Sequence, residues 1–288
     1  MASLKIIRKR ISSVKSTQQI TKAMKMVAAA KLRRAQEAAQ QARPYAEKLS
    51  QLLQTVAARA GEDVSHPLLA PHATEKRIDV ILVTSDRGLC GGYNATLIRK
   101  LDQFVRQHAD AEVRITAVGN KGYNYYRKRP AGVAGQHIHL GAGPGLSLAL
   151  DLSAQVANAY LEDKADAVYV VYSSFRSALV QVPTIERLLP VPAATDATNA
   201  PQADYIYEPD EATLLDRLLR QYITTLIHRA FLESIASEHG ARMTAMDNAT
   251  ANARDMIDRL TLVMNRARQA AITTELMEIV SGAEALKG

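Results

Sequence analysis

Apolar residues recur at alternating steps of three and four along the first 60 residues, a spacing typical of a helix with one apolar seam. Thirteen of the sixteen seam positions from Leu4 to Val56 are apolar. The polar exceptions are Gln18, Thr21 and Lys25. A neighbouring apolar stripe is supplied there by Ile20, Met24 and Val27, which predicts a local shift of the seam. We predict one helix over residues 3–58, roughly 80 Å long at 1.5 Å per residue.

A second long helix is predicted over residues 209–285. Pro209 suits a first helical turn, and Asp210 and Glu211 favour the positive end of the helix dipole. Its distal half keeps an unbroken seam, which we place at Met246, Ala249, Ala253, Met256, Leu260, Val263, Ala267, Ala270, Thr274 and Met277. The length would be roughly 115 Å at the same rise.

Between the two helices, residues 77–190 alternate short apolar runs with amphipathic stretches. The predicted strands are 78–84, 113–119 and 166–173, and the predicted helices are 94–108, 121–128 and 146–163. This alternation favours a small doubly wound α/β sheet covered on both faces. Residues 180–189 could add an antiparallel edge strand, and residues 191–208, rich in Pro, Ala, Asn and Thr, read as a linker.

The predicted fold is therefore an antiparallel two-helix coiled coil of segments 1–60 and 209–288, with a Rossmann-like α/β domain over 77–190 inserted between them. The second helix is 21 residues longer, so roughly 30 Å of it should project beyond Met1. That end carries apolar residues around its axis, namely Ala267, Ala270, Ala271, Ile272, Leu276, Met277, Ile279, Val280, Ala283 and Leu286. Such a helix is not stable exposed to water, so we expect a protein sleeve around it. A frayed end, or one folded back on its own domain, is the alternative.

Charge is unevenly distributed along the chain. Residues 1–60 hold 13 Lys and Arg against two Glu, a net charge of +11, although the whole chain carries only +7. A basic arm suggests an acidic partner, which could be nucleic acid, anionic lipid or an acidic protein surface; a solvated helix face is the plain alternative. Trp is absent and Phe occurs three times, which is sparse for an ordinary compact core.

Other sequence features limit the class of protein. The single cysteine, Cys90, excludes a disulfide framework within the chain and favours a reducing compartment. No uninterrupted apolar run is long enough to span a bilayer, and the first residues do not resemble a secretory signal.

Candidate chemistry is sparse. The turn around Gly88 and Cys90 follows a strand and precedes a helix, as phosphate-binding turns do, but it matches neither standard glycine pattern. Gly141-Ala-Gly-Pro-Gly is weaker, because Pro144 lacks an amide donor. His108, His137 and His139 offer no evident partner for a catalytic thiol. We expect no catalytic residue, no cofactor and no metal site.

Four stretches resemble the gamma subunit of F-type ATP synthases, and they occur in the order and spacing of that family. They are ITKAMKMVAAAKLRRA at 20–35, TSDRGLCGGYN at 84–94, SEHGARMTAM at 237–246 and RQAAITTELMEIVSGA at 268–283. The last matches the family signature most closely. The resemblance covers both ends and the middle of the chain.

This resemblance implies a function. The chain would be a central rotor shaft that turns inside a ring of three alpha and three beta subunits and itself catalyses nothing, coupling proton flow to ATP synthesis or hydrolysis. The α/β domain would contact the epsilon subunit and the c-ring. The chain would lie at the cytoplasmic side of a bacterial plasma membrane, attached through the complex only. Chloroplast members carry an inserted cysteine pair that this chain lacks, so thiol control is not expected.

The resemblance also implies residues that contact partners. Carried over by position, they are Met24, Lys25, Arg242, Arg268, Gln269, Thr273, Glu275 and Glu278. The basic stretch from Lys22 to Arg34 would face an acidic loop of beta.

Two other classes remain open from the sequence alone. A nucleic-acid-binding coiled coil would fit the basic arm, although Tyr45 is its only aromatic residue. A nucleotide-dependent enzyme on the central domain would require saturable nucleotide binding by that domain.

Overall fold

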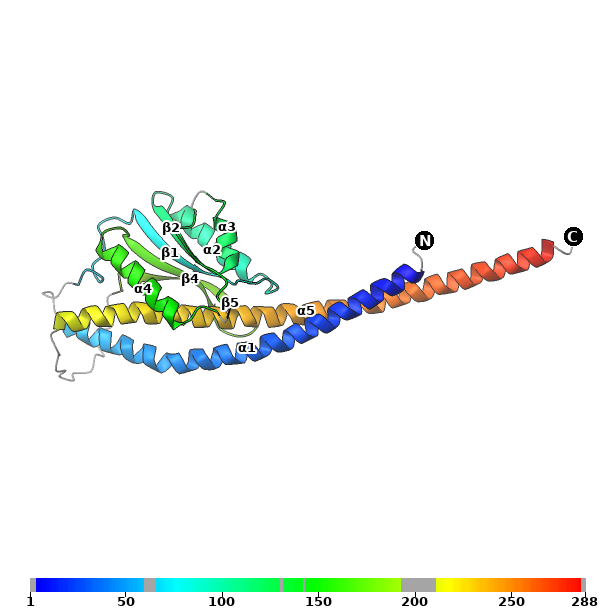
Figure 1. The fold of residues 1–288 in the computed structure, drawn as a ribbon, viewed down its shortest axis with the longest axis horizontal. Helices are drawn as coiled ribbons and strands as arrows, with labels where there is room; N and C mark the ends of the chain where they lie inside the picture. The colour runs from blue at the N-terminus through cyan, green and yellow to red at the C-terminus, as the bar shows by residue number, and fades with distance from the viewer. Residues whose placement is uncertain (1–3, 60–65, 130–131, 142, 193–210, 286–288) are drawn as a thin grey trace. The chain divides into compact units, whose positions relative to one another are not determined.

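The computed structural model describes residues 4–59, 66–129, 132–141, 143–192 and 211–285. It forms two compact units. The hairpin unit consists of the residues up to Ala28 and those from Met243 on, and the sheet unit runs from Ala29 to Arg242. Helix α1 (Leu4–Arg59) and helix α5 (Glu211–Ala285) each contribute to both units (Figure 1).

The two long helices agree closely with their predicted bounds. Helix α1 continues through Pro44 without ending there. The start predicted for the second helix, at Pro209 and Asp210, and residues 193–208 of the predicted linker lie outside the described residues.

The sheet unit contains five strands in the order β3-β2-β1-β4-β5. Strands β1 to β4 pair with one another in parallel, and β5 pairs antiparallel with β4, as predicted. The strands are β1 (Arg77–Val83), β2 (Glu112–Val118), β3 (Gly135–His137), β4 (Ala167–Phe175) and β5 (Gln181–Leu189). The helices between them are α2 (Tyr93–Gln107), α3 (Asn120–Tyr126) and α4 (Leu146–Leu161). Strand β3 was not predicted, because three residues are too few to set up an alternating pattern.

The sheet is covered on both faces, as the doubly wound pattern predicted (Figure 1). On one face, Leu97 and Leu101 of α2 are fully buried against Val80 and Ile115 of the sheet. On the other face, α4 and the first half of α5 bury a larger cluster. Its members include Ile81, Val170, Leu152, Leu219, Ile223 and Phe231, and Leu49 and Leu53 of α1 join it. The long helices are therefore part of the core of the sheet unit.

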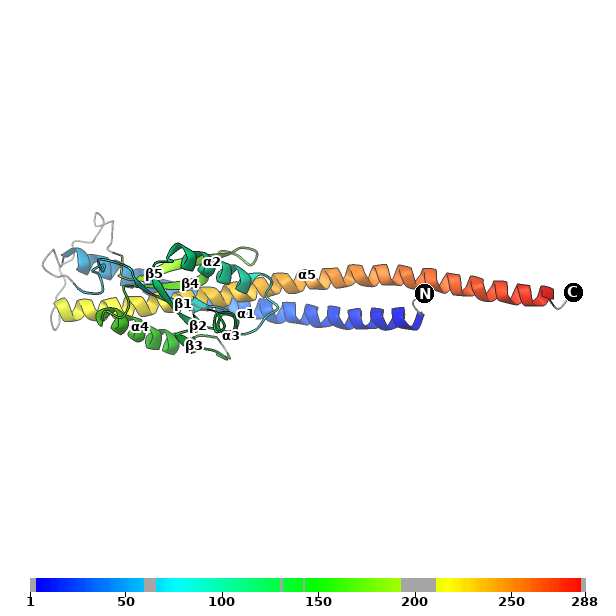
Figure 2. The ribbon, with the colours of Figure 1, turned by 90° about the horizontal axis from the view of Figure 1, so that it is seen from above.

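In the hairpin unit the two helices are antiparallel (Figures 1 and 2). The hydroxyls of Thr21 and Thr250 lie 2.8 Å apart, and Lys25 Nζ lies 2.7 Å from Asp247 Oδ1. The residue numbers of the paired positions rise along α1 as they fall along α5. These two pairs therefore fix both the antiparallel orientation and the register of the helices.

The predicted shift of the α1 seam is wrong. Thr21 is buried, whereas Ile20 and Val27 of the proposed alternative stripe are exposed. The seam stays on its original line because two of its three polar residues find polar partners on α5: Thr21 bonds to Thr250, and Lys25 bonds to Asp247. A seam can carry polar residues when their hydrogen bonds are satisfied across it.

The predicted α5 seam is partly wrong. Met246 and Ala253 are buried as predicted, but Met256 and Val263 are exposed and Ile257 and Met264 are half-buried instead. The two candidate seams share every second position and differ by one residue at the others. At 256/257 and 263/264 both alternatives are apolar, so the pattern alone could not choose between them; the position of α1 does.

In the part of the chain that the structure describes, no helix is long and apolar enough to cross a membrane.

Candidate functional site

The end of α5 continues as a single helix past the start of α1 (Figures 1 and 2). The pairs Thr21–Thr250 and Lys25–Asp247 set a register that brings Leu4 level with Ala267. We call residues 269–283 the α5 tip. It remains helical to Ala285, so the alternative of a frayed end is wrong for the described residues.

The α5 tip exposes large apolar side chains. They are Ile272, Leu276, Met277, Ile279 and Val280, each between 49% and 67% exposed. At about 100° per residue, Ile272, Leu276, Ile279 and Val280 fall on one side of the helix, and Met277 widens that stripe. Ala270 and Ala271 lie on the remaining surface. Exposed apolar surface of this kind is typical of a protein contact site.

Five of the predicted contact residues lie on or next to this tip. Arg268, Gln269, Thr273, Glu275 and Glu278 are all exposed. The hydroxyl of Thr273 donates to the carbonyl of Gln269, 3.0 Å away, one turn earlier on the same helix. Their side chains are accessible to a partner in the isolated chain.

Met24 and Lys25 lie on the paired part of α1. Met24 is half-buried, and Lys25 donates to Asp247 of α5. Both remain partly accessible, with 41% of the Lys25 side chain exposed. Asp247, which the sequence analysis did not single out, is the carboxylate that holds Lys25 in place. Of the basic stretch that follows, Lys22, Lys31 and Arg34 are exposed, and Arg33 pairs with Glu37 on its own helix.

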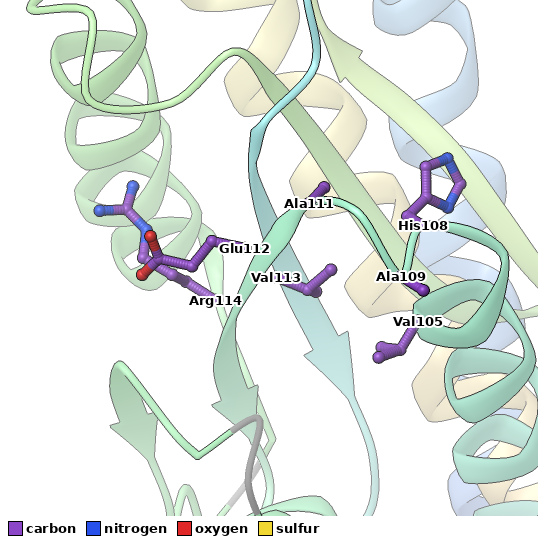
Figure 3. A pocket seen from close by; sticks show the side chains of 7 residues that line it. All are labelled: Val105, His108, Ala109, Ala111, Glu112, Val113 and Arg114. Atoms are coloured by element: carbon purple, nitrogen blue, oxygen red, sulfur yellow. The ribbon is translucent and has the colours of Figure 1, made fainter.

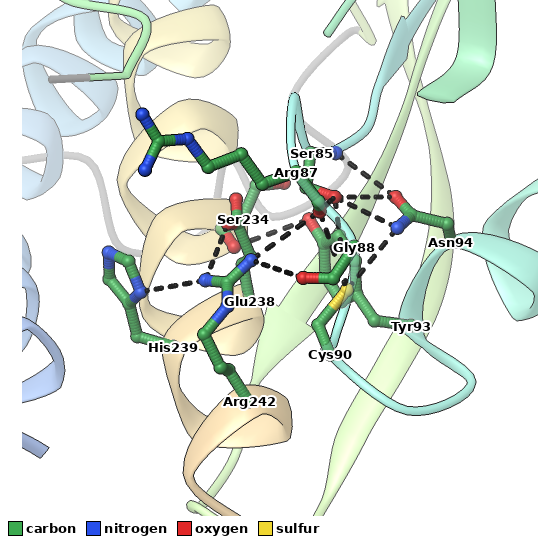
Figure 4. A network of polar contacts seen from close by, with 10 residues as sticks. All are labelled: Ser85, Arg87, Gly88, Cys90, Tyr93, Asn94, Ser234, Glu238, His239 and Arg242. Atoms are coloured by element: carbon green, nitrogen blue, oxygen red, sulfur yellow. Dashed lines mark hydrogen bonds and ion pairs between the residues drawn. The ribbon is translucent and has the colours of Figure 1, made fainter. Parts of the chain in front are cut away.

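Arg242 is different, because the fold itself engages its side chain (Figure 4). Its guanidinium pairs with Glu238 at 2.7 Å, and its NH2 group donates to the carbonyls of Gly88 at 3.2 Å and Arg87 at 3.4 Å. The side chain is only 12% exposed. Sequence reasoning missed Glu238, although its spacing of four residues from Arg242 on a helix is a signal for such a pair.

The turn that Arg242 holds is the one that resembled a phosphate site. It presents carbonyl oxygens to a guanidinium, whereas a phosphate requires amide donors. Asn94 completes the turn by donating to Ser85 and to the sulfur of Cys90. Burial raises the pKa of the Cys90 thiol, which favours the unreactive protonated form. The arrangement is that of a structural turn.

His239 also belongs to this network (Figure 4). An NH1 group of Arg242 lies 3.2 Å from its Nδ1. Burial, followed by the positive charges of Arg242 and Lys31, lowers the pKa of His239 to about 4. The ring is therefore neutral at physiological pH, and its Nδ1 can accept a hydrogen bond from the guanidinium.

A hollow of about 340 Å³ lies beside the end of α2 and the start of β2 (Figure 3). Two of its polar side chains are engaged within the chain: Arg114 pairs with Asp79, and His108 Nδ1 lies 2.9 Å from the carbonyl of Phe104. No group of three metal-ligating side chains occurs among the residues that the structure describes. The hollow offers no evident chemistry.

Comparison with solved structures places the fold among the rotors of ATP synthases. A central-stalk chain of the Tetrahymena thermophila mitochondrial ATP synthase is 26% identical with a TM-score of 0.63, over 80% of this chain and 99% of that one. A chain from the OSCP/F1/c-ring structure of the Euglena gracilis mitochondrial ATP synthase has a TM-score of 0.66 at 18% identity, over 98% and 94% of the two chains.

Sequence comparison is more specific. The family described as ATP synthase matches residues 3–286. Proteins named ATP synthase gamma chain from Geobacter sp. (strain M21) and Anaeromyxobacter sp. (strain Fw109-5) are 48% and 49% identical, over 100% of both chains. This chain belongs to the ATP synthase gamma chain family.

Proposed function

We propose that this chain is the central-stalk rotor of a bacterial proton-driven F-type ATP synthase. It transmits torque between the c-ring and the catalytic hexamer of alpha and beta subunits, and thereby couples proton flow to ATP synthesis or hydrolysis. The full-length similarity to bacterial gamma chains and the fold shared with solved rotors support this role.

The observation that carries the proposal is the α5 tip. It is a single helix that leaves Ile272, Leu276 and Ile279 exposed in the isolated chain. A surface of this kind is stable in water only when a partner covers it. A collar formed by alpha and beta subunits would cover it, and Arg268, Gln269, Thr273, Glu275 and Glu278 would then contact the collar. Met24, Lys25 and Arg242 would lie at or near further contacts with beta.

The chain carries no catalysis of its own in this proposal. The turn that would have to bind a nucleotide directs carbonyls at Arg242, which supports a mechanical role for the α/β domain. The three parts would be the N-terminal helix 1–60, the α/β domain 77–190 and the C-terminal helix 209–288. The domain would contact the epsilon subunit and the c-ring, at the cytoplasmic face of the plasma membrane.

Reconstitution tests the proposal. The purified chain mixed with alpha and beta subunits should form a complex that hydrolyses ATP, whereas the chain alone should not. A variant that lacks residues 270–288 should assemble or couple poorly and keep the circular-dichroism signal of the sheet. Failure of the full chain to bind alpha and beta, or ATP turnover by the chain alone, would contradict the proposal.

A further inference from the structure

In doubly wound sheets, ligands bind in the crevice at the carboxyl ends of the strands where the chain order reverses. In this sheet that point lies between β1 and β4, since β2 and β3 lie on one side of β1 and β4 lies on the other. Pairing between β1 and β4 extends only to Leu82 and Val171. Strand β4 runs on to Phe175 and pairs with β5 to that point, but beyond Val171 its edge on the β1 side needs other partners.

Side chains of α5 supply those partners. Ser237 donates to the carbonyl of Ser173 at 2.9 Å, and the amide of Ser173 donates to Ser234 at 3.4 Å. The amide of Phe175 donates to Glu233 at 3.3 Å. Ser234 and Ser237 are buried, so these bonds are shielded from water.

The β1 side of the crevice is held by Arg242. Its ion pair with Glu238 and its bonds to the carbonyls of Arg87 and Gly88 connect α5 to the turn after β1. That turn contains Leu89, whose φ of 64° is unusual for a residue with a side chain. A strained backbone persists where its surroundings determine it, and here Arg242 is one of those surroundings.

We infer that α5 occupies the crevice of the α/β domain in which other doubly wound sheets bind a ligand, and that Arg242 is the positioning residue that fastens the turn of residues 84–92 to the helix. We call this contact the joint. The joint lets the α/β domain and the part of α5 up to Arg242 turn as one body. This inference rests on the proposed rotor function for its mechanical consequence, but the fastening itself is a property of the chain alone.

The single cysteine provides a direct probe of the joint. Cys90 is 2% exposed and lies within the fastened turn. In the full chain, Arg242→Ala should make Cys90 react about tenfold or more faster with a thiol reagent, because the turn opens more often once its charged hydrogen bonds are lost. Arg242→Lys keeps a charge for Glu238 but lacks the planar fork, so its rate should be intermediate. The control is Arg217→Ala, which removes an exposed arginine from the same helix.

Circular dichroism separates an open joint from a lost fold. If Arg242→Ala also lost its sheet signal, the Arg242→Lys variant would decide the question. A Cys90 rate equal to that of the unmodified chain in a folded Arg242→Ala or Arg242→Lys variant would overturn the inference.

The mechanical consequence is measured in the reconstituted, membrane-bound complex. Arg242→Ala should lose proton pumping per ATP hydrolysed, and Arg242→Lys should restore part of it. A merely destabilised subunit would lower hydrolysis and pumping together. If the unmodified chain supported no pumping, the rotor proposal would fail and the thiol measurement would still test the joint. If pumping per ATP were unchanged in Arg242→Ala, the inference about the joint would fail and the rotor proposal would still stand.

Discussion

Lys25 of α1 and Asp247 of α5 form an ion pair across the helical hairpin, with their Nζ and Oδ1 atoms 2.7 Å apart. Lys25 occupies a seam position that an apolar residue would ordinarily fill. Because a polar residue in a seam is tolerated only opposite a suitable partner, the pair selects one register from several that an apolar seam would permit.

Reversing the charge of Lys25 tests this register. Lys25→Glu should destabilise the hairpin unit by about 1 kcal/mol, since it places like charges together at a half-exposed site. Adding Asp247→Lys should restore the loss. Amide hydrogen exchange of residues 4–28 measures the effect, with the exposed Lys22→Glu as control. A double variant no more protected than Lys25→Glu would contradict the register.

Gly119 should be irreplaceable in the sheet unit. Its φ is 101°, and a Cβ placed there would lie 2.1 Å from the carbonyl oxygen of Thr84. Gly119→Ala should therefore cost several kcal/mol of unfolding free energy, of order 3 or more. Gly145→Ala is the matched control, since its Cβ meets no atom within 4 Å and the change at this helix N-cap should cost about 1 kcal/mol or less. Denaturant unfolding compares the two, and equal losses would show that the Gly119 backbone is not constrained as described.

His239 should make stability depend on pH. Its pKa is lowered to about 4 in the folded chain, so between its ordinary value of about 6.5 and 4 the unfolded chain binds a proton that the folded chain does not. Stability should fall as the pH falls through that window. Arg242, Lys31 and Glu238 are the charged groups that act on the site.

The neutral variant His239→Gln should flatten that part of the pH profile, measured by denaturant unfolding at a series of pH values. His137→Gln, which changes a histidine outside the network, serves as control. An unchanged slope in His239→Gln would show that the ring is not held neutral.

Much of the fold could be predicted from the sequence, because the long helices and the buried parallel strands repeat their patterns over many residues. The errors lie where two alternative seams of a helix would bury similar apolar area. Met256 and Ile257 serve a seam equally well, and only the position of α1 decides between them. Thr21 and Lys25 suggested a shifted seam because their partners, Thr250 and Asp247, lie more than 200 residues away.

The site was predictable to a different degree. The exposed α5 tip follows from the greater length of the second helix, which the extent of its apolar pattern predicts. The fastening of the turn by Arg242 could not be foreseen, because it depends on main-chain carbonyls of Arg87 and Gly88, which carry no sequence signal. Strand β3 was missed for a related reason, as its three residues are defined by their pairing with β2.

The proposed rotor role requires that a collar of alpha and beta subunits enclose the α5 tip. Ile279 is 67% exposed in the isolated chain. A cysteine placed there by Ile279→Cys should react rapidly with a thiol reagent in the free chain. Native Cys90 is buried and should contribute little to the measured rate. In the complex with alpha and beta subunits, the account predicts that the rate falls by about tenfold or more. An equal rate in the free chain and in the complex would contradict the account.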